Sequence, residues 1–106
     1  MFDPTHNAHA DYYLVRGDLA GSWEGLPSDV GIAAWNFDRR DESLAFFAKR
    51  GHPLLIAGYY DAPVEQVDRW LDAARKVKGV RAVMYTTWAA RYDDLEPFAE
   101  RVRAWK

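Results

Sequence analysis

A chain of 106 residues has room for one domain, with a core large enough to fold without disulfides or metals. An apolar share of 49% with 15% aromatic residues excludes a disordered chain, because disordered chains are poor in both. The formal net charge is −2 and charges of both signs are interspersed, which excludes a basic surface for nucleic acid or an anionic membrane.

Cysteine is absent, so the chain has no disulfide, thiolate nucleophile or thiolate metal site. No cationic leader with an apolar run opens the sequence, and its nearly apolar stretches of roughly 6 to 8 residues are far shorter than the ~20 needed to span a bilayer. We therefore expect a cytoplasmic protein without a membrane or nucleic-acid partner and without a cofactor.

Three short apolar segments bounded by turn residues are typical of strands buried on both faces of a parallel sheet: 30–36, 53–58 and 80–86. Each precedes a segment with helical periodicity, and these helices are expected at 41–50, about 62–78 and about 94–105. Gly51 and Gly79 stand where the first two helices end. Aspartates are placed to cap the three helix starts: Asp38 or Asp41, Asp61, and Asp93 or Asp94.

Strands that alternate with helices through short loops require right-handed crossovers and a parallel sheet in sequential order. We predict an α/β fold with three parallel strands, or four if residues 12–15 add one, and with helices on one face, like part of a (βα) barrel. The whole chain, 1–106, is expected to be a single domain in which 1–29 form an irregular N-terminal segment and 30–106 the three strand-helix units.

This arrangement leaves the face opposite the helices without cover. Three arrangements would bury that face: residues 1–29 folding across it, a second copy of the chain, or the missing strands of a barrel. We favour the second copy and expect a homodimer. The uncovered face is expected to bear some of Ile32, Ala34, Leu55, Ala57, Ala82 and Met84.

Ligands of parallel α/β sheets bind beyond the carboxyl ends of the strands. Aromatic and polar side chains stand together there: Trp35, Asn36 and Asp38; Tyr59, Tyr60 and Asp61; Tyr85, Thr87 and Trp88. Such a set suits a sugar ring, which packs its C–H face on an aromatic ring and hydrogen-bonds through its hydroxyls. The alternative, which the residues alone favour, is that the aromatic side chains close the end of the hydrophobic core.

Asp38 and Asp61 are a candidate carboxyl pair for glycoside hydrolysis, but helix capping is the commoner role of aspartates at these positions. We therefore assign no catalytic residue. Near the N-terminus, Asp3, His6, His9 and Asp11 are metal-ligand types without a fixed geometry, so no metal site is assigned either.

Five runs resemble the C-terminal part of bacterial glycoside hydrolase-like TIM-barrel proteins related to the hexosaminidases, and together they extend over nearly the whole chain. The runs are MFDPTHNAH (1–9), YYLVRG (12–17), WNF (35–37), IAGYYD (56–61) and MYTTW (84–88). The resemblance implies that the three strands are the sixth, seventh and eighth of a barrel. It also implies a sugar pocket lined by Trp35, Tyr60, Asp61, Tyr85 and Trp88.

The catalytic acid of that family follows the fourth barrel strand, a region that this chain does not contain, and a full barrel needs about 250 residues. We therefore expect a non-catalytic partial-barrel domain that self-associates through its uncovered face and retains weak carbohydrate binding. Two alternatives stay open: a glycoside hydrolase assembled from two copies, or an interaction module or remnant without a ligand.

Overall fold

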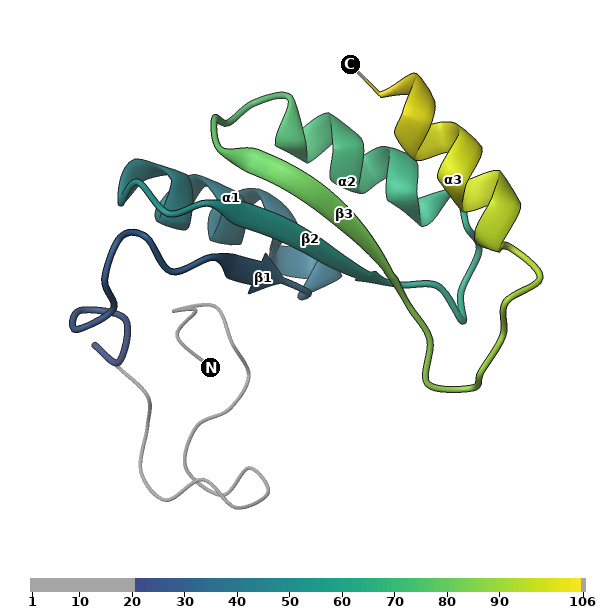
Figure 1. Cartoon of the computed structure of the whole chain (residues 1–106), viewed down its shortest axis with the longest axis horizontal. Helices are drawn as coiled ribbons and strands as arrows, with labels where there is room; N and C mark the ends of the chain where they lie inside the picture. Colours follow the sequence, from purple (N-terminus) through teal and green to yellow (C-terminus); the bar gives the residue numbers. More distant parts are fainter. Residues whose placement is uncertain (1–20, 106) are drawn as a thin grey trace.

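The computed structural model describes residues 21–105, and it confirms the α/β fold. Its three strands form one open parallel sheet in the order β1-β2-β3. They alternate with three α-helices, and a short 3-10 helix follows the first strand (Figure 1). The elements are β1 (Ile32–Ala34), η1 (Phe37–Arg39), α1 (Arg40–Lys49), β2 (Leu54–Tyr59), α2 (Gln66–Ala74), β3 (Val80–Thr86) and α3 (Leu95–Ala104).

The strand register contains one irregularity at the start of β2. Leu54 pairs with Val80 whereas Leu55 pairs with Ala82, so β3 carries one extra residue, Arg81, at a β-bulge. Beyond the bulge the pairing is regular and ends with Tyr59 opposite Thr86. These two residues therefore lie side by side at the carboxyl edge of the sheet.

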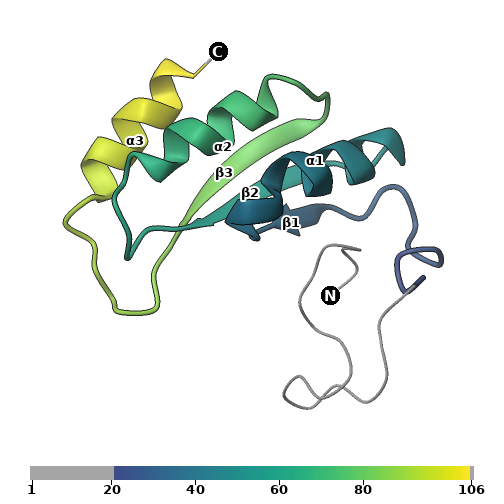
Figure 2. The ribbon, with the colours of Figure 1, turned by 180° about the vertical axis from the view of Figure 1, so that it is seen from behind.

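The helices lie on one side of the sheet, and Figure 2 shows α1 in front of β1 and β2 when the molecule is seen from behind. The main buried cluster joins α1, β2 and α2, and burial of each large apolar side chain contributes about 1.5 to 3 kcal/mol. Its members include Leu44, Phe47, Leu54, Ile56 and Trp70. A second cluster lies beneath α3 and contains Tyr60, Val64, Val67, Leu71 and Phe98.

Helix α2 is shorter at both ends than the expected 62–78. Pro63 lacks an N–H and its carbonyl accepts from Gln66, so the chain enters the helix through turns with i to i+3 hydrogen bonds. At the other end Lys76 and Val77 also bond three residues back, before Gly79 takes a positive φ of 95°. The apolar periodicity continues through these turns, which is why it overestimates the helix.

The predicted aspartate caps are wrong, since no side-chain hydrogen bond caps any of the three α-helices within residues 21–105. The predicted stop at Gly51 is confirmed. Its φ is 84°, its N–H donates to Ala48, and the next N–H, that of His52, donates to Phe47. This pair of bonds is the Schellman arrangement, which satisfies carbonyls at the end of α1.

The face opposite the helices, here called the open face, is formed by Leu55, Ala57, Ala82 and Met84. Ile32 and Ala34, the other two candidates for this face, pack into the helix-side cluster, because alternate residues of a strand point to opposite faces. Of the N-terminal segment, only 21–29 are described. There the ring of Trp23 meets Phe46 of α1 at 5.5 Å between centroids, so this part packs on the helix side rather than across the open face. The expected strand at 12–15 lies outside the described residues.

Candidate functional site

A hollow of about 340 Å³ opens on the open-face side of the sheet, at the carboxyl ends of the strands. It is called the aromatic pocket below. Its aromatic members come from all three strand ends and are exposed, Trp35 by 48%, Tyr59 by 44% and Trp88 by 89%. The lining residues are Trp35, Ala57, Tyr59, Thr86, Thr87 and Trp88.

The strand geometry explains why these side chains meet. Ala57 and Tyr59 are two residues apart in β2 and therefore point to the same face, opposite Ile56 in the core. The register then places Thr86 of β3 beside Tyr59. Ala57 is only 9% exposed, and its small side chain leaves space between the larger aromatic residues.

Asp61 organises the loop that carries Trp88. Its carboxylate accepts hydrogen bonds from the main-chain N–H groups of Trp88 at 2.7 Å and Ala89 at 3.0 Å, and from the hydroxyl of Thr87. The guanidinium of Arg91 donates to the main-chain oxygen of Asp61 at 3.2 Å. The loop after β3 is therefore tied to the end of β2.

These contacts set the charge state of the carboxyl group. Desolvation raises the pKa of Asp61, but the hydrogen bonds from Thr87, Trp88, Ala89 and Tyr59 outweigh it, and the pKa lies below its usual range. The carboxylate is thus ionised at neutral pH and accepts hydrogen bonds only. The hydrogen bond of the Tyr59 phenol to Asp61 raises the pKa of that phenol, and desolvation and the negative charge of the carboxylate raise it further.

Further hydrogen bonds hold the rest of this loop. The N–H of Arg91 donates to Oγ1 of Thr87 at 3.0 Å, and the hydroxyl of Tyr85 donates to the carbonyl of Arg91 at 2.9 Å. Ala90, between Thr87 and Arg91 in the chain, has a positive φ of 53°, which is unfavourable for a residue with a Cβ. The surrounding bonds stabilise that conformation.

Tyr60 and Tyr85 were expected to line the sugar pocket, but they lie on the helix side of the sheet. Tyr60 is 1% exposed and packs between Tyr85, at 5.1 Å between centroids, and Phe98, at 4.9 Å. Burial raises the pKa of the Tyr60 phenol well above its usual range. Strand alternation therefore places both tyrosines on the core side, Tyr60 within the buried cluster and Tyr85 partly buried against it.

Asn36 and Asp38, also predicted for the site, do not line the aromatic pocket. Asn36 is half-buried before η1, and Asp38 is exposed within η1. Conversely, Ala57 and Thr86 line the pocket but were not predicted as site residues. The sequence contained a signal for both residues, since strand alternation places each on the same strand face as a predicted residue. Neither side chain is aromatic or charged, however, so neither was chosen.

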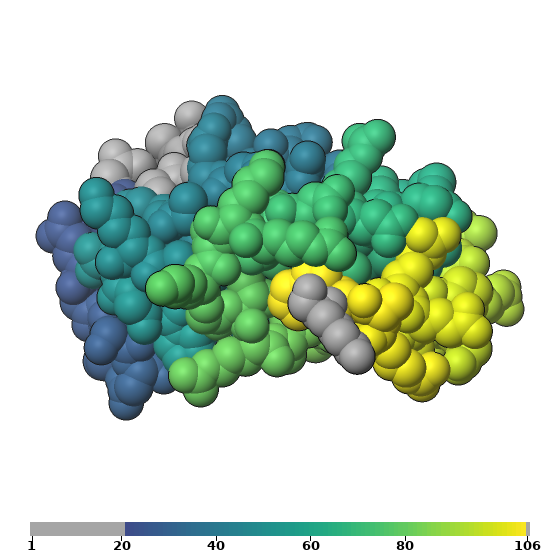
Figure 3. All heavy atoms as spheres, turned by 90° about the horizontal axis from the view of Figure 1, so that it is seen from above, coloured from purple at the N-terminus to yellow at the C-terminus, as the bar shows by residue number. Residues whose placement is uncertain are grey.

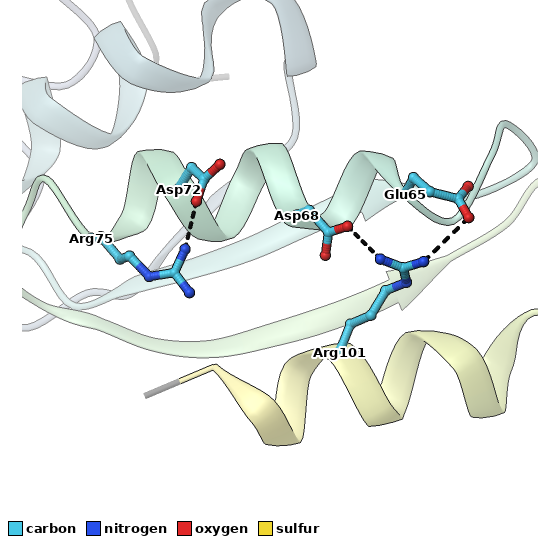
Figure 4. Close-up of polar contacts among 5 residues, drawn as sticks. All are labelled: Glu65, Asp68, Asp72, Arg75 and Arg101. Carbon is cyan, nitrogen blue, oxygen red and sulfur yellow. Dashed lines mark hydrogen bonds and ion pairs between the residues drawn. The ribbon is translucent and has the colours of Figure 1, made fainter.

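A second hollow, of about 330 Å³, lies between α2 and α3. Figure 3 shows α3, in yellow, against the green surface of the segments that precede it. Here Arg101 of α3 reaches across to Asp68 of α2 and to Glu65 just before it, as Figure 4 shows. These contacts join two helices, so we assign this hollow to packing.

Within residues 21–105, no group of three or more histidine, aspartate or glutamate side chains is arranged to hold a metal ion. The metal-ligand types Asp3, His6, His9 and Asp11 lie outside this range. No helix of the described part is long and apolar enough to cross a membrane. Comparison with protein-family models, with curated proteins and with solved structures gives no match to this chain.

Proposed function

We propose that this chain is a non-catalytic domain that binds a carbohydrate ring in the aromatic pocket. The observation that carries the proposal is the convergence of Trp35, Tyr59 and Trp88 from three strand ends beside two threonine hydroxyls. Exposed aromatic faces pack on the C–H face of a sugar, and neighbouring polar groups hydrogen-bond its hydroxyls. The volume, about 340 Å³, suits a single sugar ring.

The state of Asp61 favours binding over hydrolysis. A general acid must hold a proton near neutral pH and have access to the glycosidic oxygen. Asp61 instead has a lowered pKa, and loop donors occupy both of its oxygens. Asp38, its proposed partner in a hydrolase assembled from two copies, does not line the pocket.

A panel of methyl glycosides of glucose, galactose, mannose and N-acetylglucosamine tests the proposal, with binding followed by tryptophan fluorescence and NMR shifts. We expect Trp88→Ala to weaken binding about tenfold, which corresponds to about 1.4 kcal/mol. Tyr92→Ala is the matched control, because Tyr92 is an exposed aromatic residue, 62% accessible, outside the pocket. Absence of binding by every sugar, or equal loss in both variants, would refute the proposal.

Packing of the aromatic side chains without any ligand is the competing explanation, and stability measurements separate the two. Tyr60→Ala removes a core ring and should lower the free energy of unfolding by about 3 to 5 kcal/mol. Trp88→Ala, at 89% exposure, should leave stability nearly unchanged while it weakens saccharide binding about tenfold. A large stability loss in Trp88→Ala would favour the packing explanation.

The open face favours self-association as a second function. Leu55, Ala57, Ala82 and Met84 have no helix over them among residues 21–105, and Met84 is 43% exposed. We propose that a second copy of the chain buries the part of this face formed by Leu55, Ala82 and Met84, beside the aromatic pocket, as in a half-barrel derived from a glycoside hydrolase-like protein. Light scattering on a sizing column should give a dimer mass that Met84→Glu reduces to a monomer. A compact monomer over the whole concentration range would refute self-association.

A further inference from the structure

The hydroxyl protons of the two threonines in the aromatic pocket are already committed to protein acceptors. Thr86 donates its single hydroxyl proton to the carbonyl oxygen of Gly58 at 2.6 Å, and this carbonyl can only accept. Thr87 donates its proton to the ionised carboxylate of Asp61. Neither threonine retains a proton to offer a ligand.

The hydroxyl oxygens of the two threonines differ in the number of lone pairs that can still accept a hydrogen bond. Thr87 Oγ1 also accepts from the N–H of Arg91 at 3.0 Å, so one of its two lone pairs is used. Thr86 lines the pocket, and within residues 21–105 no donor reaches its Oγ1, so neither lone pair of this oxygen is used there. Of the two threonine hydroxyls of the pocket, that of Thr86 thus has the greater accepting capacity.

We propose that Thr86 determines specificity by accepting a hydrogen bond from a free hydroxyl of the bound sugar. Gly58 fixes the direction of this bond, because its carbonyl accepts the single hydroxyl proton of Thr86. The ligand class is therefore a saccharide with an unsubstituted hydroxyl at the position facing Thr86, and a group that only accepts is disfavoured there. This inference rests on the proposed carbohydrate binding.

Monodeoxyfluoro derivatives of the methyl glycoside that binds in the panel test the direction of the bond. Fluorine is close in size to a hydroxyl group but cannot donate. We expect one derivative to bind about three- to tenfold more weakly than the parent sugar, the range that corresponds to one net hydrogen bond. Thr86→Val, which keeps the shape and removes the oxygen, should bind parent and fluoro sugar equally, whereas Thr86→Ser should restore the difference.

The outcomes separate the two proposals. If no methyl glycoside binds, carbohydrate binding is refuted and this inference with it. If the parent sugar binds and every fluoro derivative binds as tightly, only the assignment of Thr86 as an acceptor is refuted. The assignment of Thr86 is also refuted if Thr86→Val still binds the fluoro derivative more weakly than the parent sugar by the full wild-type ratio. A merely structural role of Thr86 would have this result, because the variant would then weaken the binding of the parent sugar and of the fluoro derivative by the same factor. Far-UV and near-UV circular dichroism of both variants checks that they fold.

Discussion

The carboxylate of Asp61, just after β2, accepts a hydrogen bond at 2.7 Å from the main-chain N–H of Trp88, just after β3. This contact connects two strand ends that are neighbours in the sheet but 27 residues apart in the chain. Because Trp88 is the most exposed member of the aromatic pocket, its position depends on the loop and not on side-chain packing. The architecture of the pocket therefore rests on an aspartate that does not line it.

Replacement of Asp61 by alanine should loosen the loop after β3 more than it lowers global stability. Three donors, on Thr87, Trp88 and Ala89, lose their acceptor together. We expect faster amide exchange at residues 87–91 and weaker saccharide binding. Asp38→Ala is the control, since this aspartate of η1 is exposed and lies outside the pocket. Unchanged exchange in Asp61→Ala would contradict the role assigned to its carboxylate.

The same contact predicts a pH dependence of loop order. The pKa of Asp61 is lowered in the folded protein from an ordinary value of 3.8, so its stabilising effect is fully present above that value. It is lost as the pH falls through the lowered folded pKa. Amide exchange at Trp88 and Ala89, corrected for its intrinsic pH dependence, should show constant protection at pH 5 to 7 and a decline below about pH 4. Asp61→Asn should lack this acid-dependent decline.

Tyr60 should make the protein sensitive to alkali. Its hydroxyl is buried with no hydrogen-bond partner among residues 21–105, and burial raises the pKa of the phenol. A raised folded pKa means that stability is intact below the ordinary tyrosine pKa of about 10 and is lost as the pH rises beyond it. Denaturant unfolding at pH 7 and pH 11 should show a steep loss in the wild type.

Tyr60→Phe tests the role of this buried hydroxyl group directly, because the substitution removes the hydroxyl and keeps the ring. Removal of an unpaired buried hydroxyl should leave the free energy of unfolding at pH 7 within about 1 kcal/mol of the wild type, or raise it. The variant should also keep more of its stability at pH 11. A loss well above 1 kcal/mol at pH 7 would mean that the hydroxyl has a favourable partner.

The sequence predicted the fold well because the signals for strands and helix ends are local. Three apolar runs predicted β1, β2 and β3, and β3 was placed at both ends as observed. Gly51 marked the end of α1 through its need for a positive φ. The aspartate caps were predicted wrongly because a carboxylate can accept hydrogen bonds from any nearby donor, not only from the first N–H groups of the adjacent helix. For Asp61 the main-chain N–H groups of a distant loop are the partners, and sequence spacing does not show them.

The site was predicted less well because position after a strand does not decide which face a residue joins. Tyr59 and Tyr60 are adjacent and chemically alike, yet one lines the pocket and the other lies in the core. Strand alternation separates them only when the register and the side of the helices are known. Thr86 was not predicted because only the strand register shows that it lies beside Tyr59.

Gly58 should not tolerate a side chain, since a Cβ at this position would overlap the hydroxyl oxygen of Tyr60 and lie 2.7 Å from its Cζ. Gly58→Ala should therefore lower the free energy of unfolding by about 1 to 3 kcal/mol through overpacking. Gly25→Ala is the matched control, because nothing lies within 4 Å of its added Cβ. Combination with Tyr60→Phe should recover only part of the loss, since the ring carbon remains in place. Equal stability of the two glycine variants in urea would contradict this packing.

Arg101 should contribute a small, salt-dependent stabilisation to the packing of α3 on α2. Its guanidinium contacts Asp68 and also Glu65 at 3.2 Å, and its side chain is 34% exposed (Figure 4). Partly exposed pairs are screened by solvent, so Arg101→Gln should lower the free energy of unfolding by at most about 1 kcal/mol. Because ~1 M salt shortens the screening length to about 3 Å, the difference should shrink there.

The control for Arg101 lies two residues further along the same helix. Arg103 contacts Glu96 at 3.1 Å, but both side chains are about 70% exposed and both belong to α3, so Arg103→Gln should have no measurable effect. Urea unfolding of the two variants at low and high salt separates an interhelical ion pair from a general loss of positive charge. Equal losses in both variants would assign the effect to net charge, and a loss in Arg101→Gln that salt does not change would assign it to the packing of the arginine's methylene groups against α2.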